Sequence, residues 1–251
     1  MKSALLLAAG KATRLGALRD RYAKACVPVN GTTPLRQLIE QLAAAGVHRF
    51  VVNLHWQAAQ VRAAAAAAVK SVDAEVLFLE EPQLLGTGGS LLACLRQFNV
   101  FPDLVVNAKL FTDVNWQELL ETPEGCLVVH PASELATFGG LLTEAHADGL
   151  YLEGLWPKSR AQAGELPNPP LQAAVYTGIC RPSRAWLPQL ENESVHAQAD
   201  GIPLCLARAG FLAHASAGNQ VPIYVHAGVW CEISTPERVS EASTIVPGLI
   251  A

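Results

Sequence analysis

Two basic residues closely follow the first apolar run of the chain. The run from Ala4 to Ala9 ends at Gly10, and Lys11 and Arg14 come just after it. A continuous apolar run is typical of a strand that is buried on both faces of a parallel sheet. Open α/β sheets bind ligands at the carboxyl ends of their strands. Glycine there lets backbone N–H groups approach an anion, and lysine and arginine supply charge for phosphates. The spacing alone fits an ordinary turn between a strand and a helix equally well.

A second basic segment adds a resemblance to a known family. Residues 7–15 read LAAGKATRL, and residues 23–31 read AKACVPVNG. They resemble the amino-terminal motifs of the sugar-phosphate nucleotidyltransferases, L-A-A-G-x-G-T-R-L and P-K-A-L-V-P-V-x-G. Ala12 replaces the second glycine of the first motif, and Ala23 stands where proline is usual in the second.

The resemblance implies roles for this part of the chain. Arg14 and Lys24 would be the catalytic residues, because they would hold the nucleoside triphosphate and the sugar phosphate and offset charge as the α-phosphate is attacked. The nucleotide would also lie against the first loop, which consists of Leu7, Ala8, Ala9, Gly10 and Lys11.

Three further segments resemble the family along the length of the chain. Residues 81–90, EPQLLGTGGS, resemble E-x-x-x-L-G-T-G-G, where a glycine-rich turn at a helix start packs against the base and ribose. Residues 175–179, VYTGI, resemble the sugar-site strand, and residues 230–238, WCEISTPER, resemble W-x-D-V-G-T-P-E-R. Short bacterial enzymes that act on N-acetylmuramate or other sugar 1-phosphates match best. The implied nucleotide-binding residues are Glu81, Gly86, Thr87, Gly88 and Asn107, and the implied sugar-binding residues are Thr177, Gly178 and Trp230.

The metal-binding positions of the family are altered in this sequence. Family members hold Mg²⁺ with the aspartate of an N-x-D segment and the aspartate of W-x-D, since hard cations prefer oxygen ligands. Here Lys109 stands two residues after Asn107, and Glu232 takes the second position. An ammonium has only donors and cannot ligate a cation. Either Lys109 replaces the metal as a fixed cation, or Asp113 captures a displaced Mg²⁺ together with Glu232.

The elements that must position these residues alternate along the first half of the chain. Strands are predicted at 4–9, 50–54, 75–79 and 104–107, and helices at 35–45, 57–69 and 88–98. Later strands are predicted at 126–130, 150–155, 175–180 and 223–225, with a helix at 236–243. This order predicts an α/β fold with a Rossmann-like mixed, mostly parallel sheet and helices on both faces, like the nucleotide-diphospho-sugar transferases. We expect one domain over 1–251, with a nucleotide-binding half at 1–120 and a sugar-binding or acceptor-binding half at 121–251.

Composition narrows the class of protein. The net charge of −4 gives no electrostatic footprint for nucleic acid. The first apolar run is too short for a signal peptide, and no apolar stretch reaches the length of a membrane span. The six cysteines lie far apart and indicate buried thiols in a reducing compartment, so we expect a cytoplasmic protein. With 51% hydrophobic and only 16% charged residues, part of the surface is expected to be covered, for example in a homodimer.

Two functions follow from these observations. The first is a nucleotidyltransferase, using Mg²⁺ if active, that joins a nucleoside triphosphate and a sugar 1-phosphate, releases pyrophosphate, and is weakened by Lys109. The alternative is an inactive relative that binds a nucleotide or sugar phosphate, or serves as a partner subunit.

Overall fold

The first apolar run forms β1 (Lys2–Leu7), the central strand of the amino-terminal sheet. The computed structural model describes residues 1–131 and 134–248. These residues belong to two units, each of which is described by itself. Of the described residues, the first unit contains 1–85, 93–120 and 228–248, and the second contains 86–92, 121–131 and 134–227.

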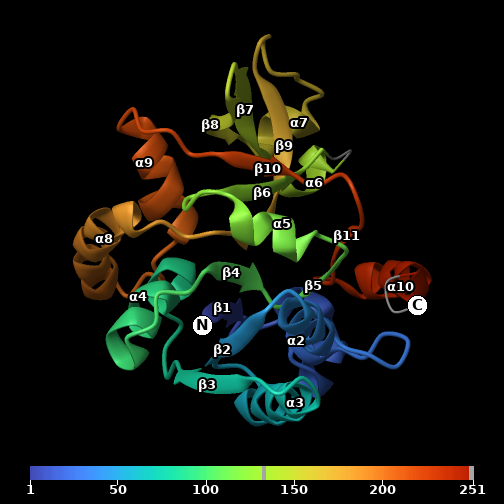
Figure 1. Ribbon diagram of the computed structural model, residues 1–251. Coiled ribbons are helices and arrows are strands. Elements are labelled where there is room, and N and C mark those ends of the chain that lie inside the picture. Colours follow the sequence, from blue (N-terminus) through green and yellow to red (C-terminus); the bar gives the residue numbers. More distant parts are fainter. Residues whose placement is uncertain (132–133, 249–251) are drawn as a thin grey trace. The chain divides into compact units, whose positions relative to one another are not determined.

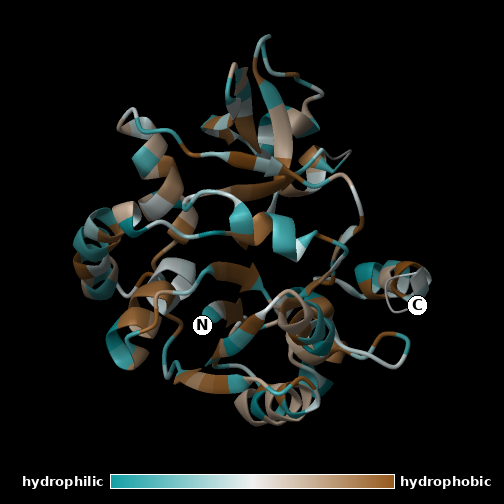
Figure 2. Ribbon diagram, viewed as in Figure 1, coloured by the Kyte–Doolittle hydropathy of each residue, from teal (hydrophilic) through white to brown (hydrophobic). Residues whose placement is uncertain are grey.

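Four parallel strands make the sheet of the first unit. Their order is β4 (Leu104–Asn107), β1, β2 (Val47–Leu54) and β3 (Glu75–Glu80). The strands are apolar along most of their length in Figure 2, and β1, β2 and β4 are largely buried, whereas β3 at the end of the order is mostly half-buried. The register pairs Leu7 with Asn107 and Leu6 with Val52, so the carboxyl ends of three strands meet at one edge.

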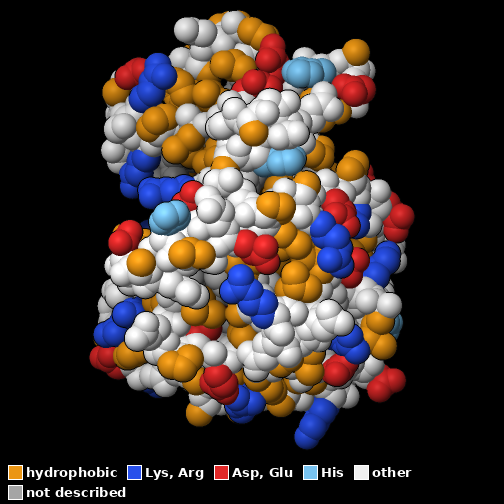
Figure 3. Space-filling model, turned by 90° about the vertical axis from the view of Figure 1, so that its left-hand side faces the viewer, with side chains coloured by type: hydrophobic (Ala, Val, Ile, Leu, Met, Phe, Trp, Pro, Cys, Tyr) orange, Lys and Arg blue, Asp and Glu red, His pale blue; other side chains and the backbone are white. Residues whose placement is uncertain are grey.

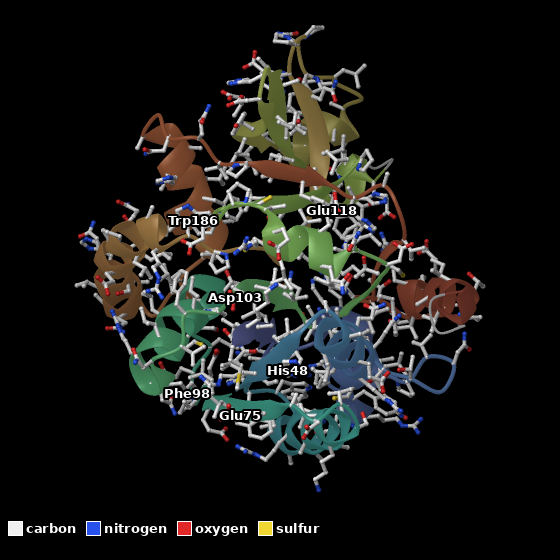
Figure 4. All side chains as sticks on the ribbon, viewed as in Figure 1. His48, Glu75, Phe98, Asp103, Glu118 and Trp186 are labelled. Atoms are coloured by element: carbon white, nitrogen blue, oxygen red, sulfur yellow. The ribbon has the colours of Figure 1, made fainter. Side chains whose placement is uncertain are left out.

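Side chains at the amino ends of the strands make contacts that hold neighbouring strands together. Asp103, labelled in Figure 4, precedes β4 and accepts a hydrogen bond from the Ser3 backbone N–H at 2.7 Å. Glu75, also labelled there, begins β3 and pairs with Arg49 at 2.7 Å. These contacts hold the amino ends of the strands in place. The loops that carry the basic residues follow the carboxyl ends.

Helices and short turns complete the first unit. Helix α2 (Pro34–Ala44) starts at Thr33, whose hydroxyl caps the Arg36 N–H, and α3 (Ala58–Ser71) packs beside it (Figure 1). The remaining elements are η1 (Thr13–Leu15), α1 (Leu18–Arg21), η2 (Lys24–Cys26), α5 (Trp116–Glu121), α10 (Pro236–Ile245) and η5 (Val246–Gly248).

A two-stranded antiparallel ribbon brings the end of the chain back to the first unit. Strand β5 (Leu110–Thr112) pairs with β11 (Trp230–Glu232), and Leu110 lies opposite Glu232. The first unit thus takes in residues 228–248 and leaves out residues 86–92, so the predicted halves at 1–120 and 121–251 stay a prediction. That the whole chain acts as one domain stays a prediction.

The second unit is built from antiparallel pairs and one parallel pair. Strand β6 (Leu127–His130) pairs antiparallel with β9 (Gln172–Cys180) and parallel with β10 (Ile223–Val225). Strand β7 (Gly140–His146) pairs with β8 (Gly149–Trp156) and with β9. Its helices are α6 (Leu135–Phe138), α7 (Lys158–Gln162), η3 (Arg184–Trp186), α8 (Leu187–Asp200), the π-helical η4 (Ala207–Leu212) and α9 (Ala213–Ser216).

Helix α4 (Gly86–Phe98) is shared between the units, since its first turns belong to the second unit and its end to the first. The predicted α/β fold with a mixed sheet is confirmed. Within the described ranges 1–131 and 134–248, no helix is both long and apolar enough to cross a membrane.

Candidate functional site

The loop after β1 is held by a buried asparagine that the sequence analysis missed. Asn53, in β2, is 4% exposed, and its Oδ1 accepts hydrogen bonds from the backbone N–H groups of Ala8 and Ala9 at 2.6 and 3.0 Å. Gly10 and Lys11, directly after this anchor, are exposed. The loop therefore leaves the sheet in a fixed direction. The available signal was a polar residue near the end of an otherwise apolar run.

Glu81 continues the same network. Its carboxylate is buried: Oε1 accepts from Asn53 Nδ2 at 2.9 Å, and Oε2 accepts from the Leu85 backbone N–H at 3.1 Å. The network links the ends of β1, β2 and β3 to the residue before Gly86. Glu81 thus positions the first loop, and direct contact with a nucleotide stays a prediction.

The alanine that replaces the family glycine adopts a glycine-like conformation. Ala12 has a φ of 55° and a ψ of 24° at the start of η1, in the left-handed region that costs an alanine about 1 kcal/mol or more. It is 2% exposed and packs in an apolar cluster with Leu15, Val27, Phe111 and Ile233. The turn before Arg14 thus has a glycine-like conformation although alanine stands at this position.

Replacing Ala12 with Gly is expected to change the free energy of unfolding by less than about 1 kcal/mol. Glycine relieves the left-handed strain but loses one buried methyl group, worth about 0.8 kcal/mol, and adds freedom to the unfolded chain. Ala65→Gly is the matched control, because Ala65 is equally buried but lies inside helix α3. It should lose about 1 to 2 kcal/mol. Denaturant unfolding measures both, and equal losses would contradict the strain at Ala12.

Four charged side chains converge in the first unit. Lys109 Nζ donates to Glu232 Oε1 at 2.7 Å, and an Arg14 guanidinium nitrogen lies 3.7 Å from the same oxygen. The Glu232 side chain is 8% exposed and that of Lys109 24%, whereas that of Arg14 is 58% exposed. Lys24, at the start of η2, is close enough for its pKa to respond to all three. Three cations thus surround one carboxylate, which leaves net positive charge for an anion.

The proximity of these charges shifts the pKa values of Lys24 and Glu232. Burial, and then the charges of Lys109 and Arg14, lower the pKa of Lys24 to about 8, although Glu232 acts in the opposite direction. Burial raises the pKa of Glu232, but Lys109, a hydrogen bond with Ser234 and the charge of Arg14 outweigh it, so the pKa lies below its ordinary value. Glu232 is therefore ionised at neutral pH and holds the cations in place.

The position of Lys109 is fixed by the backbone. Asn107 pairs with Leu7 across β4 and β1, and the Lys109 carbonyl accepts from the Ile233 N–H at 3.0 Å. Lys109 is therefore held in place by backbone pairings on both sides. It stands where the first metal-binding aspartate was expected.

The donor set does not fit a divalent cation. Mg²⁺ binds oxygen at about 2.1 Å. A Mg²⁺ on Glu232 Oε1 would thus lie within about 4.8 Å of Lys109 Nζ. At an effective dielectric constant of about 20, their repulsion is about 7 kcal/mol. This oxygen of Glu232 therefore does not suit a divalent cation while Lys109 is paired with it.

The structure also keeps the predicted rescue ligand away from Glu232. Asp113 lies three residues beyond Leu110, the ribbon partner of Glu232, which is about 10 Å along the strand. Its Oδ1 accepts from the Val229 N–H at 2.6 Å. The ribbon register thus separates the two carboxylates that were expected to share a Mg²⁺.

The glycine-rich turn at the start of α4 has a packing role within the second unit. Gly86 has a φ of +79°, and a Cβ there would lie 2.4 Å from the Leu204 carbonyl oxygen. The Gly88 N–H donates to that oxygen at 2.9 Å, and the Thr87 hydroxyl accepts from the Leu206 N–H at 2.9 Å. This contact accounts for the Gly-Thr-Gly sequence, and nucleotide binding by these residues stays a prediction.

The predicted sugar-binding residues are largely buried. Thr177, in β9, is 1% exposed and donates its hydroxyl to the Val128 carbonyl at 2.7 Å, and Gly178 follows with a φ of 82°. Trp230, in β11 of the first unit, is 9% exposed. Their burial does not test a role toward a sugar, so that role stays a prediction.

Comparisons with known proteins give matches over the amino-terminal part of the chain and over its fold. Residues 4–109 match the family described as MobA-like NTP transferase domain. The chain is 25% identical, over 94% of its own length and 60% of the relative's, to a candidate mannose-1-phosphate guanyltransferase of Sulfolobus acidocaldarius. It is 34% identical to the N-acetylmuramate alpha-1-phosphate uridylyltransferase of Caulobacter vibrioides, over 42% of this chain and 45% of that protein. It thus spans about half the length of these curated relatives.

A solved structure shares the fold. The UTP-bound UGPase of Acinetobacter baumannii superposes with a TM-score of 0.74 over 98% of this chain and 93% of that one, at 15% sequence identity. The matched segment covers the first loop, Arg14, Lys24, Asn53 and Lys109. Residues 4–109 of the chain are therefore similar to a nucleotidyltransferase domain, and the fold is shared with a solved UGPase.

Proposed function

We propose that the protein joins a nucleoside triphosphate and a sugar 1-phosphate and releases pyrophosphate. The convergence of Arg14, Lys24 and Lys109 around Glu232, beside the exposed loop after β1, carries this proposal. A site with this charge excess suits a reaction in which two phosphorylated molecules meet. Both curated relatives carry names of sugar-1-phosphate nucleotidyltransferases, which supports this substrate class.

The reaction needs charge stabilisation more than covalent chemistry from the protein. A phosphate oxygen of the sugar 1-phosphate forms a bond to the α-phosphorus, the bond from that phosphorus to the bridging oxygen breaks, and pyrophosphate leaves with the electron pair. Negative charge accumulates on the α-phosphate oxygens and on the leaving group. Arg14 and Lys24 stabilise this charge, and Lys109 adds a third cation where relatives would hold a metal.

The other predicted contacts remain part of this proposal. We propose nucleotide contacts for residues 7–11, Glu81, Asn107 and the start of α4, and sugar contacts for Thr177, Gly178 and Trp230. The family uses Mg²⁺, but the pair of Lys109 and Glu232 does not fit it. Without that charge, turnover is expected to be slower than in a metal-bearing enzyme by orders of magnitude.

The same ion pair favours a second candidate, a relative that binds nucleotide or sugar phosphate without turnover. Measuring pyrophosphate release separates the two. The purified chain is incubated with each common nucleoside triphosphate and a panel of sugar 1-phosphates, with Mg²⁺ or with EDTA. Sustained release that depends on one sugar phosphate and is lost in Lys24→Met supports the transferase. Nucleotide binding without any release supports the inactive relative.

We also propose a cytoplasmic homodimer. The six cysteines are unpaired, five of them buried, which suits a reducing compartment. The second unit exposes large apolar side chains, with Leu166 80%, Val195 65% and Ile202 62% exposed. On the face in Figure 3, basic and acidic side chains are interspersed rather than gathered by sign. Light scattering of the purified chain tests the oligomeric state.

A further inference from the structure

We infer that this chain binds the triphosphate of its nucleotide without a divalent cation at Glu232, because the ammonium of Lys109 already occupies the cation's role there. The inference rests on the proposed function, since it concerns the same nucleotide. It predicts a metal requirement opposite to the one that the family's two aspartates imply.

The position of the Lys109 ammonium is fixed by contacts of its backbone and of its side chain. Its backbone is pinned by the Ile233 N–H, and its ammonium lies 2.7 Å from a carboxylate that is itself 8% exposed. An ammonium carries three donors, and the bond to Glu232 uses one. The side chain keeps 24% exposure, so a phosphate oxygen can approach the remaining donors.

The charges around Lys109 also favour a triphosphate without a bound metal ion. Arg14 shares the Glu232 oxygen, and Lys24 lies within their field, so three cations are balanced by one carboxylate. Mg²⁺ on a triphosphate cancels part of its negative charge. The free triphosphate is therefore the better electrostatic match for this site, whereas a site with two carboxylates needs the metal complex.

Calorimetric titration of the full chain with GTP, UTP, CTP and ATP, in EDTA and in millimolar Mg²⁺, tests the inference. The best-bound triphosphate is expected to bind at least as tightly in EDTA as in Mg²⁺. Affinity that rises about tenfold or more with Mg²⁺ would overturn the inference while leaving the proposed function intact. Failure of every triphosphate to bind in either condition would instead overturn the proposed function.

Substitutions of Lys109 provide a second readout. Lys109→Gln keeps the length of the side chain but not its charge, and should weaken binding in EDTA by about tenfold or more. Lys109→Asp places two carboxylates together. Binding should then become dependent on Mg²⁺, and Mg²⁺ should raise the melting temperature of this variant but not that of the parent.

Lys70→Gln is the control, because Lys70 is exposed on α3 and belongs to no part of the proposed site. Its triphosphate affinity should match that of the parent in both conditions. If Lys109→Gln binds like Lys70→Gln in EDTA, Lys109 does not supply the charge and the inference is wrong. Melting curves of all three variants show that each one folds.

Discussion

Replacing Lys24 with Met is expected to stabilise the fold while removing most of its activity. The pKa of Lys24 is lowered to about 8 because the ammonium is partly buried and faces Lys109 and Arg14. The folded state therefore disfavours the charged form, and an apolar side chain of similar length avoids that penalty. We expect a gain of about 1 kcal/mol in the free energy of unfolding at pH 7. Phosphate stabilisation is lost at the same time, and turnover should fall by about 100-fold or more.

The pH dependence distinguishes this explanation from a packing effect. Below pH 8, Lys24 is charged in both the folded and the unfolded chain, so the parent bears the full penalty. As the pH rises from about 8 to about 10.4, the folded chain releases its proton first, and the parent gains stability relative to the variant. The advantage of Lys24→Met should therefore disappear near pH 10.4. Thermal unfolding across this range measures it.

Lys70→Met is the matched control, because it removes an equally charged but exposed lysine. Its stability relative to the parent should change little with pH. A variant Lys24→Met that is less stable than the parent at pH 7 would show that the charge of Lys24 stabilises the fold. The cation cluster would then need another explanation.

The parallel sheet of the first unit could be predicted from the sequence because β1, β2 and β4 are largely buried and form continuous apolar runs. The run that forms β4 was predicted with the bounds observed, and β1 and β3 differ only at their ends. Two elements of the second unit were missed for physical reasons. Strand β7 is buried at its start and exposed only at Ala145 and His146, without a regular alternation, and α8 buries only Leu190 and Ser194, so neither has a sustained apolar period.

The charged cluster shows what sequence motifs can and cannot specify. The resemblance assigned Arg14, Lys24, Lys109 and Glu232 to one site. In the structure, the side chains of Arg14 and Lys109 both lie against the same oxygen of Glu232. The partner of Lys109 could not be predicted, because it depends on the register of a ribbon between segments over a hundred residues apart. The same register separates Asp113 from Glu232 by three positions. Spacing along the chain holds no information about that pairing.

The buried pair of Asn53 and Glu81 should be the most sensitive polar contact of the first loop. Asn53→Ala removes the acceptor of two backbone N–H groups and the donor to a buried carboxylate. An unsatisfied buried group costs about 1 to 3 kcal/mol, so the total loss is expected to be about 3 to 4 kcal/mol. Nucleotide affinity should fall as well, because the loop loses its anchor. Denaturant unfolding and calorimetry measure the two effects.

Two conservative substitutions separate geometry from charge. Asn53→Asp keeps the acceptor for Ala8 and Ala9 but sets a second carboxylate about 2.9 Å from Glu81. This repulsion raises a carboxyl pKa, so the loss of about 2 to 3 kcal/mol should shrink as the pH falls toward 5. Glu81→Gln lacks one of the two acceptors that Asn53 and Leu85 require, and should lose about 1 to 3 kcal/mol. Asn115→Asp, an exposed position that keeps its cap on Glu118, is the control and should change stability by less than about 0.5 kcal/mol.

The double variant with Asn53→Asp and Glu81→Gln should recover most of the lost stability. Its glutamine can donate Nε2 to the new aspartate and accept the Leu85 N–H with Oε1. The four hydrogen bonds described above are then restored, with donor and acceptor exchanged only between residues 53 and 81. The single negative charge moves to residue 53, where two backbone N–H groups receive it. We expect the double variant to lie within about 1 kcal/mol of the parent, which implies a coupling energy of at least about 2 kcal/mol. Additive losses in this cycle would mean that the two side chains act separately and that the first loop is held by other contacts.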